Sequence, residues 1–341
     1  MERHRSGRAR ILIFVQEVSY LVMGWLSCLL TVVVIIDILH AMLGAFYFLI
    51  MQRQSDFLQN IMSEISAVHS LACVVVAFLF TAYGFHRCMN PVVNEVKIAL
   101  PNLHPDLNGF RIGVISDLHV GPWFREKFVR KVVDLTNAGT PDVIVFVGDV
   151  ADGLPRHLVS DYAPLRELRA EHGVLFVTGN HEYYWDVNVW LETLRKLGFI
   201  TLMNSSQIIQ RGQGALAIVG VPDAQAKDFP PAEKPDIVRA LNTVPPAEML
   251  RILLVHNPNV AQAAARAGVH LQISGHTHGG QFFPWTWFIH LFTRFSSGLF
   301  VVEGMKLFVG RGAGAWGPPL RMGSSPEIPL IVLHSDVLSR E

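Results

Sequence analysis

Hydrophobic residues are distributed unevenly along this chain of 341 residues. Two stretches near the N-terminus are almost wholly apolar, because residues 18–50 contain one formally charged side chain, Asp37, and residues 65–85 contain none. Beyond residue 110 the pattern changes to short apolar runs separated by polar or amphipathic segments. A helix needs about 20 apolar residues to cross a bilayer, so either N-terminal stretch is long enough to be a membrane span.

The first apolar stretch is longer than one span requires. Its 33 residues would form a helix about 50 Å long, against a hydrocarbon core of about 30 Å. We expect one long helix, a polar loop at 52–60 and a second helix at about 65–85. A break near Asp37 would instead make the first stretch a hairpin and give three spans. A signal peptide is disfavoured, because no small-residue cleavage pattern follows a short apolar core.

Basic residues flank these stretches asymmetrically. Four arginines precede the first stretch, Arg87 and Lys97 follow the second, and the loop between them offers only Arg53. Since Lys and Arg favour the cytoplasmic side, we expect an integral protein of the inner or plasma membrane whose C-terminal domain is cytoplasmic. A hairpin in the first stretch would place that domain on the opposite side.

The apolar runs beyond residue 110 are rich in branched and aromatic residues, which is typical of short buried strands. Five of them cover residues 110–116, 142–147, 173–178, 251–255 and 269–274. Amphipathic segments at about 123–137, 187–198 and 258–267 predict helices between them.

Alternating strands and helices predict an α/β domain at 110–341. A membrane anchor at 1–89 and a linker at 90–109 precede it, and part of the linker is expected to add a strand to the domain. The segment 223–235, rich in Pro and charged residues, predicts an exposed loop.

Each of the five apolar runs is followed by a polar cluster. If the strands lie side by side in one sheet, their carboxyl ends meet at one edge, so distant residues can share a site. One cluster alone is a weak indication, but five in register are a strong one. The clusters are Asp117-Leu118-His119, Gly148-Asp149, Gly179-Asn180-His181, His256-Asn257-Pro258 and Gly275-His276-Thr277-His278.

The residue types in these clusters are those that hold two divalent cations about 3.5–4 Å apart, with a bridging hydroxide that attacks a phosphoryl group. Asp149 is the expected bridge between the two cations. The ligands expected for one cation are Asp117, His119 and His278, and those for the other are Asn180, His256 and His276. His181 follows a ligand directly, so it is expected to orient the phosphate or to protonate the leaving oxygen.

Cysteine does not contribute to this site, because Cys28, Cys73 and Cys88 all precede the α/β domain. Imidazole, carboxylate and amide ligands favour Mn²⁺, Fe²⁺ or Zn²⁺ as the cofactors. The formal net charge of zero, with no long basic run, does not favour nucleic acid as a partner. The sequence does not specify an oligomeric state.

The motifs DLHVG, GDVADG, GNHEYY, HNP and GHTHGGQ resemble those of the calcineurin-like metallophosphoesterase superfamily. The resemblance spans residues 110–335, and the tail GRGAGAWGPPLRMGSSPEIPLIVL is similar to the branch of transmembrane proteins with a metallophosphoesterase domain. It implies a four-layer α/β/β/α sandwich, the seven metal ligands named above and a catalytic His181. Some relatives in this branch cleave UDP-2,3-diacylglucosamine on the route to lipid A, and others are phosphodiesterases.

These observations predict a membrane-bound di-metal phosphoesterase that acts on a phosphodiester or pyrophosphate bond. Tethering to the bilayer favours a lipid-linked substrate, since it raises the local concentration of the substrate at the site. The alternatives are a phosphodiesterase or phosphatase for soluble substrates and a membrane-bound metal-binding scaffold without turnover.

Two further features leave alternatives open. The aromatic segment 282–300 is expected either to line an apolar groove or lie at the lipid interface, or to form an ordinary core hairpin. Arg311 and Arg321 suit a phosphate through their guanidinium groups, but a structural role is the favoured interpretation.

Overall fold

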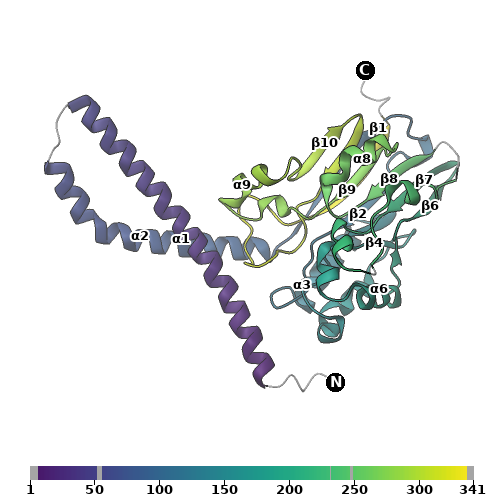
Figure 1. Cartoon of the computed structure of the whole chain (residues 1–341), viewed down its shortest axis with the longest axis horizontal. Helices are drawn as coiled ribbons and strands as arrows, with labels where there is room; N and C mark the ends of the chain where they lie inside the picture. Colours follow the sequence, from purple (N-terminus) through teal and green to yellow (C-terminus); the bar gives the residue numbers. More distant parts are fainter. Residues whose placement is uncertain (1–6, 52–55, 231, 246–248, 336–341) are drawn as a thin grey trace.

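The computed structural model describes residues 7–51, 56–230, 232–245 and 249–335. Two long helices, α1 (Gly7–Met51) and α2 (Asp56–Cys88), lead into an α/β domain (Figure 1). Both contain a segment long and apolar enough to cross a membrane, at Ile11–Phe46 and Ser70–Cys88. α1 continues through Asp37, where the hairpin interpretation needs a break. The expected polar loop at 52–60 is partly wrong, because α2 already begins at Asp56.

The two helices cross near the domain and are packed against it there. Cys28 of α1 and Ala77 of α2 are buried together with Phe282 and Leu320 of the domain. Many large apolar side chains of both helices are nonetheless exposed, among them Leu30, Leu39, Phe46, Leu71 and Phe78.

The domain contains two sheets, each with six strands among the described residues. The first has the order β1-β12-β2-β3-β4-β5. Its strands are β1 (Val92–Leu100), β2 (Arg111–Ile115), β3 (Val143–Val147), β4 (Val174–Val177), β5 (Ile200–Thr201) and β12 (Glu327–Ser335). The second has the order β10-β11-β9-β8-β7-β6. Its strands are β6 (Ser205–Arg211), β7 (Gly214–Gly220), β8 (Leu250–Leu254), β9 (Leu271–Ser274), β10 (Gly298–Val302) and β11 (Met305–Val309).

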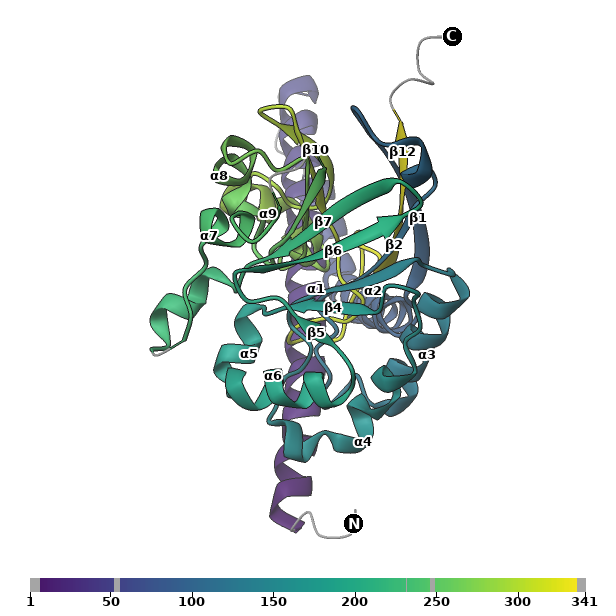
Figure 2. The same cartoon turned by 90° about the vertical axis from the view of Figure 1, so that its right-hand side faces the viewer.

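Helices cover the outer faces of both sheets (Figure 2). The α-helices of the domain are α3 (Glu126–Ala138), α4 (Val159–Tyr162), α5 (Asn180–Tyr184), α6 (Val187–Lys196), α7 (Ile237–Leu241), α8 (Ala261–Arg266) and α9 (Trp285–Phe292). Short 3₁₀ helices lie at η1 (Pro105–Leu107), η2 (Pro155–His157), η3 (Ala163–Glu167), η4 (Ala224–Asp228), η5 (Pro258–Val260) and η6 (His278–Gly280).

Three buried clusters define the layers. The central one, with Ile112, Val145 and Ile252, is formed by side chains of both sheets. A second joins α3, α4 and α6 to the outer face of the first sheet around Trp190, and a third joins α7 and α8 to the second sheet. The order helix, sheet, sheet, helix confirms the four-layer α/β/β/α sandwich.

The five motif-bearing strands lie where the sequence predicts them, but the expectation of a single sheet is wrong. β2, β3 and β4 belong to the first sheet, whereas β8 and β9 belong to the second. The carboxyl ends of the two groups meet where the sheets face each other. The linker does supply a strand, since β1 pairs in parallel with β12 along its whole length.

Two segments differ from the sequence-based expectations. The start of the predicted exposed loop at 223–235 is η4, and Asp223 and Ala226 within it are buried. In the aromatic segment 282–300, Phe282 and Phe295 are buried and β10 forms a hairpin with β11, but no residue of α9 is buried. The core-hairpin interpretation is therefore wrong for α9.

We expect that the substitution Gly24→Leu loosens α1 from the domain. A Cβ atom at Gly24 would lie 2.6 Å from Leu320 Cδ1 and 3.1 Å from Pro318 Cβ, so the still larger leucine side chain has to displace Leu320 or the helix. Overpacking of this kind costs about 1–3 kcal/mol. A cost of about one to two kcal/mol lowers the ratio of docked to undocked α1 by roughly 5- to 30-fold. The measurement is the maleimide labelling rate of Cys28, which is 2% exposed, followed by peptide mass spectrometry.

Gly44→Leu is the matched control, because it makes the same change on the same helix where a Cβ would meet nothing within 4 Å. Cys28 should react faster only in the Gly24 variant. Equal rates in both variants would contradict the close packing of α1 on the domain.

Candidate metal centre

Three predicted ligands converge at the carboxyl end of β2 and after β9. His119 Nε2 lies 3.2 Å from His278 Nε2, and His278 Nε2 lies 3.4 Å from Asp117 Oδ1. All three residues are buried, and one ligand atom from each lies within 4.8 Å of the others. The spacing suits one cation held by a carboxylate and two imidazoles.

The other predicted ligands form a second group beside the first. Asp149 Oδ2 lies 3.1 Å from His256 Nε2, which in turn lies 3.3 Å from His276 Nδ1. The side-chain oxygen of Asn180 lies 3.1 Å from the same His276 nitrogen. These four donor atoms come from the ends of β3, β4, β8 and β9, so both sheets contribute.

Asp149 lies between the two groups. Its Oδ2 atom, 3.1 Å from His256 in the second group, is 3.8 Å from His119 Nε2 in the first. The structure therefore brings all seven predicted ligand residues together, in the two sets that the sequence analysis assigns to the two cations. Asp149 has the position that a shared ligand requires.

The backbone around these side chains is strained. Five of the seven residues have a positive φ between 50° and 75°, a conformation that few non-glycine residues adopt. Such residues cost about 1–3 kcal/mol each and cluster at functional sites. The residues are Asp117, His119, Asp149, His276 and His278.

Glycine allows the loops to approach closely. Gly148 has a φ of 77°, and a Cβ there would lie 2.6 Å from Gly179 Cα and 2.7 Å from His256 Nδ1. A side chain at this position would separate the β3 loop from the β4 loop and displace a predicted ligand.

Hydrogen bonds fix the orientation of two of the imidazoles. His119 Nδ1 lies 3.1 Å from Asp152 Oδ1, and His256 Nδ1 lies 2.8 Å from the carbonyl oxygen of Val147. Both partners are acceptors, so each Nδ1 carries the proton and each Nε2 presents a lone pair to the centre. Such outer partners commonly fix the tautomer of metal-binding histidines.

Asp152 is a functional residue that the sequence analysis misses. The same carboxylate oxygen that accepts from His119 lies 2.5 Å from Nδ1 of His181. His181 Nε2 lies 3.9 Å from Asp149 Oδ2, so this ring is held beside the ligands rather than within either group. The two imidazoles lower the pKa of Asp152 against the effect of its burial, which keeps it ionised as their shared acceptor.

Glu182 is the second missed residue, and it joins two ligand-bearing loops. Its fully buried carboxylate accepts hydrogen bonds from the backbone N–H groups of Asp149, Val150 and Gly179 at 3.1, 2.8 and 2.6 Å. Burial and the neighbouring Asp149 raise the pKa of Glu182 to about 7. In the sequence the only available signal is an acidic residue in the first turn of α5.

The two C-terminal arginines have structural roles, as the favoured interpretation holds. Arg321 is 1% exposed, and its guanidinium donates to the carbonyl oxygens of His278, Arg311 and Gly314. Its backbone N–H donates to the carbonyl oxygen of Gly84 near the end of α2. Arg311 forms an ion pair with Glu327 at 3.3 Å.

The donor set fits two divalent cations. With the Nδ1 protons of His119 and His256 committed to acceptors, their Nε2 lone pairs face His278 Nε2 and His276 Nδ1 at 3.2 and 3.3 Å. Arg321 donates to Nδ1 of His278 at 2.9 Å, so without a cation a proton on His278 Nε2 occupies the first of these contacts. Burial opposes a charge on His119, but Asp152, Asp149 and Asp117 outweigh it and raise its pKa to about 9. Protons and metal therefore compete for the same lone pairs.

The centre opens into a cavity of about 570 Å³. His181, Asn180, His276 and His278 lie in its wall, together with aromatic residues. The cavity is also lined by Gln16 and Tyr20 of α1, and Glu17 forms an ion pair with Arg125 of the domain at 2.5 Å. The apolar pattern of α1 predicts a membrane anchor alone, and the contribution of this helix to the cavity is not predicted from the sequence. The aromatic lining residues are Trp123, Phe124, Tyr184, Trp185 and Trp316.

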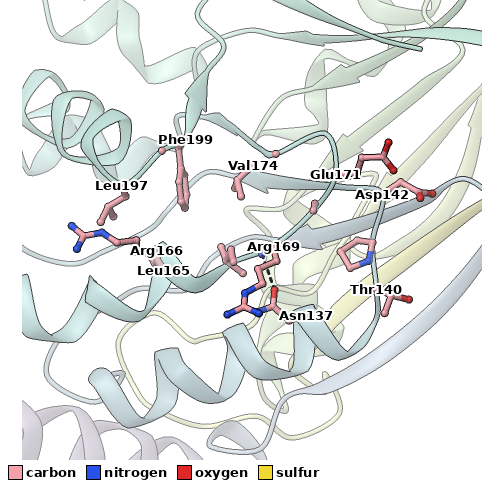
Figure 3. A pocket seen from close by; sticks show the side chains of 15 residues that line it. Asn137, Thr140, Asp142, Leu165, Arg166, Arg169, Glu171, Val174, Leu197 and Phe199 are labelled. Carbon is pink, nitrogen blue, oxygen red and sulfur yellow. Dashed lines mark hydrogen bonds between the residues drawn. The ribbon is translucent and has the colours of Figure 1, made fainter. Parts of the chain in front are cut away.

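A second hollow, of about 620 Å³, lies away from the centre (Figure 3). Asp142 and Gly173 in its wall precede β3 and β4, so it lies at the amino ends of these strands. Ligand sites of open α/β sheets lie at the carboxyl ends. None of the predicted site residues lines this hollow, and we assign it no role.

Comparison with known proteins gives the family. The family model of calcineurin-like phosphoesterases matches residues 110–280. A Danio rerio protein named transmembrane protein with metallophosphoesterase domain is 36% identical over 272 residues, which cover 77% of this chain and 62% of that protein. An uncharacterized metallophosphoesterase of Campylobacter jejuni is 33% identical over 271 residues, which cover 78% of this chain and 70% of that protein.

A solved dimetal phosphatase structure from Danio rerio aligns at 13% identity with a TM-score of 0.38, covering 60% of this chain and 88% of that one. The chain spans about three fifths of the Danio rerio transmembrane relative. Because the family model covers half of the chain and includes every predicted metal ligand, this chain belongs to the calcineurin-like phosphoesterase family.

Proposed function

We propose that this protein is a membrane-attached phosphoesterase that uses two divalent cations to hydrolyse a phosphodiester or pyrophosphate bond. The observation that carries the proposal is the convergence of seven predicted N and O ligands, six of them buried and His276 half-buried, into two groups around Asp149. Mn²⁺, Fe²⁺ and Zn²⁺ suit this donor set. When bound, the cations would act as Lewis acids on the phosphoryl oxygens and lower the pKa of a coordinated water.

His181 is placed to move a proton. Its Nδ1 donates to Asp152, and its Nε2 faces the cavity beside Asp149. A protonated Nε2 can donate to the oxygen of the leaving group as the bond to phosphorus breaks. Asp152 orients the His181 ring, and the same carboxylate oxygen also contacts His119, a predicted metal ligand, so the proposed proton donor is connected to the metal centre.

The walls of the cavity support a lipid-linked substrate. Gln16 and Tyr20 belong to the helix whose segment Ile11–Phe46 is apolar enough to cross a bilayer, so the reaction site lies beside the proposed span. The aromatic lining offers apolar contacts to a lipid or sugar portion. UDP-2,3-diacylglucosamine, a compound of lipid A synthesis, is the candidate that the sequence resemblance suggests.

The distribution of basic residues around the anchor supports a cytoplasmic catalytic domain. In that compartment a nucleotide-linked precursor would be within reach of the site. The second candidate, a phosphodiesterase for soluble substrates, is favoured by the polar side chains of the domain surface that also line the cavity, such as Gln225.

The substitution Asp149→Ala should abolish Mn²⁺-dependent hydrolysis of bis-p-nitrophenyl phosphate. Loss of the shared carboxylate removes several kcal/mol of electrostatic stabilisation, which corresponds to a decrease in kcat on the order of 10³-fold. Asp134→Ala, at an exposed position on α3, is the control and should keep its activity. A fully active Asp149 variant would refute the proposed centre, and an inactive wild type in every metal would favour a scaffold.

Removal of metal should be reversible. Dialysis of the wild-type protein against a chelator should abolish hydrolysis, and Mn²⁺, Fe²⁺ or Zn²⁺ should restore it at about two equivalents per chain. After the same chelation and addition of metal, elemental analysis of the Asp149→Ala variant should give less bound metal per chain than the wild type. Full activity of a protein shown to be metal-free would exclude the two-cation mechanism.

The role of His181 can be tested with leaving groups of different basicity. His181→Ala and Asp152→Asn should lower kcat for methyl phenyl phosphate by roughly 10²-fold or more, and less for methyl p-nitrophenyl phosphate, whose leaving group needs no proton. Asp134→Asn is the control for Asp152→Asn. Equal losses for both substrates would assign His181 to binding of the phosphate rather than to proton donation.

Tyr20→Ala should distinguish the two substrate classes. If a lipid-linked substrate contacts α1, the variant should lose about tenfold in kcat/KM on a long-chain lipid diphosphate, the equivalent of about 1.4 kcal/mol, and little on bis-p-nitrophenyl phosphate. Tyr83→Ala, which removes an exposed tyrosine of α2, should leave both rates unchanged. Equal behaviour of the Tyr20 variant on both substrates would favour the soluble class.

A further inference from the structure

α9 is an apolar helix that packs on η6 of the domain but leaves most of its large side chains exposed. Its eight residues, Trp285–Phe292, include no formally charged side chain, and none of them is buried. Leu291 and Phe292 are 77% and 78% exposed, and Trp287 is 71% exposed. Contact of such side chains with water is unfavourable by about 25 cal/mol per Å² of apolar surface. An exposed apolar patch of this kind is typical of a surface that binds a membrane or another protein.

The position of α9 indicates what covers it. Trp285 Nε1 donates to Ser27 Oγ of α1 at 3.3 Å, so the two helices touch. Leu30, one turn farther along the same face of α1, is 65% exposed. α9 lies on the side of the domain that faces the α1 and α2 pair (Figure 1). Its apolar surface is therefore continuous with that of the proposed membrane spans.

The composition of the segment fits a lipid surface. Residues 282–302 contain no acidic side chain, and the exposed Arg294 follows α9 directly. Tryptophan is favoured at the boundary between headgroups and acyl chains, and a basic residue is attracted to anionic lipids. A helix that lies in the plane of this boundary buries its Trp, Phe and Leu side chains about 5–10 Å deep, between the headgroups and the acyl chains.

We propose that α9 is an interfacial helix that inserts its apolar face into the membrane crossed by α1 and α2. The inference rests on the membrane attachment in the proposed function but not on catalysis. α9 packs on η6, which begins at the predicted ligand His278, and Gly280 is so close to Trp285 and Thr286 that a Cβ would clash with them. Insertion of α9 therefore fixes the height of the metal centre above the bilayer.

The test places an environment-sensitive fluorophore on single introduced cysteines in the full chain. Leu291→Cys reports on α9, Val238→Cys on α7 is the exposed control at 63%, and Phe46→Cys reports on α1 at 62%. The native cysteines are buried, and the unsubstituted chain serves as the labelling blank. Each variant is reconstituted into phosphatidylcholine and phosphatidylglycerol vesicles that contain nitroxide-labelled lipid.

We expect the nitroxide lipid to quench the probes at residues 291 and 46 severalfold more than the probe at 238, and aqueous iodide to show the reverse order. Quenching at 46 but not at 291 would overturn the interfacial role of α9 and leave the attachment intact. Quenching at neither position would overturn both. A third outcome is that the probe at residue 291 is protected from both quenchers, and that unlabelled Leu291→Cys copies form a disulfide with each other. That outcome would show that protein covers α9, and it would also overturn the proposal.

Discussion

The close approach of the loop after β3 to the loop after β4 is the constraint on which the rest of the site depends. Glu182 binds three backbone N–H groups across these loops, and Asp149 accepts a hydrogen bond from the backbone N–H of His181 at 2.9 Å. A buried carboxylate is costly unless it is hydrogen-bonded, and the three backbone contacts of Glu182 offset part of that cost. Asp149, the proposed shared ligand, and His181, the proposed proton donor, are thereby held by one hydrogen-bonded unit.

The same unit connects the two sheets. His256, at the end of β8, donates to the carbonyl oxygen of Val147 at the end of β3, and the backbone N–H of His276 donates to Asp117. Each of these ligands from the second sheet is thus tied to an element of the first. Asp117 and His276 both have a positive φ, which persists only because the surrounding contacts maintain it. The fold therefore holds these side chains in place without a cation, which would reduce the ordering that binding of the proposed cations requires.

Much of the site can be predicted from the sequence because ligand chemistry restricts residue types. Imidazole, carboxylate and amide groups at the ends of five apolar runs form a pattern that chance rarely produces, and the seven residues do converge. The partition of the strands between two sheets is different, since a run such as 251–255 indicates a buried strand but carries no information about its neighbour. That arrangement came only from the resemblance to a known family.

The site residues that the sequence does not predict have a common physical feature: their role depends on contacts that form only in the folded molecule. Asp152 and Glu182 are acidic side chains in loops or short helices, where the usual interpretation is an exposed surface residue. The contacts of Asp152 with two histidines and the burial of Glu182 appear only in the folded structure. Gln16 and Tyr20 reach the cavity across more than 90 residues of chain, a contact that no local pattern encodes. The exposure of α9 is likewise a property of the packed molecule, because its sequence alone suits a core element equally well.

The place of β12 has a consequence for biosynthesis. This strand lies between β1 and β2, yet it follows them by more than 200 residues. During translation the apolar helices and β1 emerge first, and β1 has no neighbour to pair with until β12 leaves the ribosome. Until then β2 presents an unpaired edge, which is prone to wrong association. The nascent domain is therefore vulnerable for most of its synthesis, and completion of the sheet is a late event.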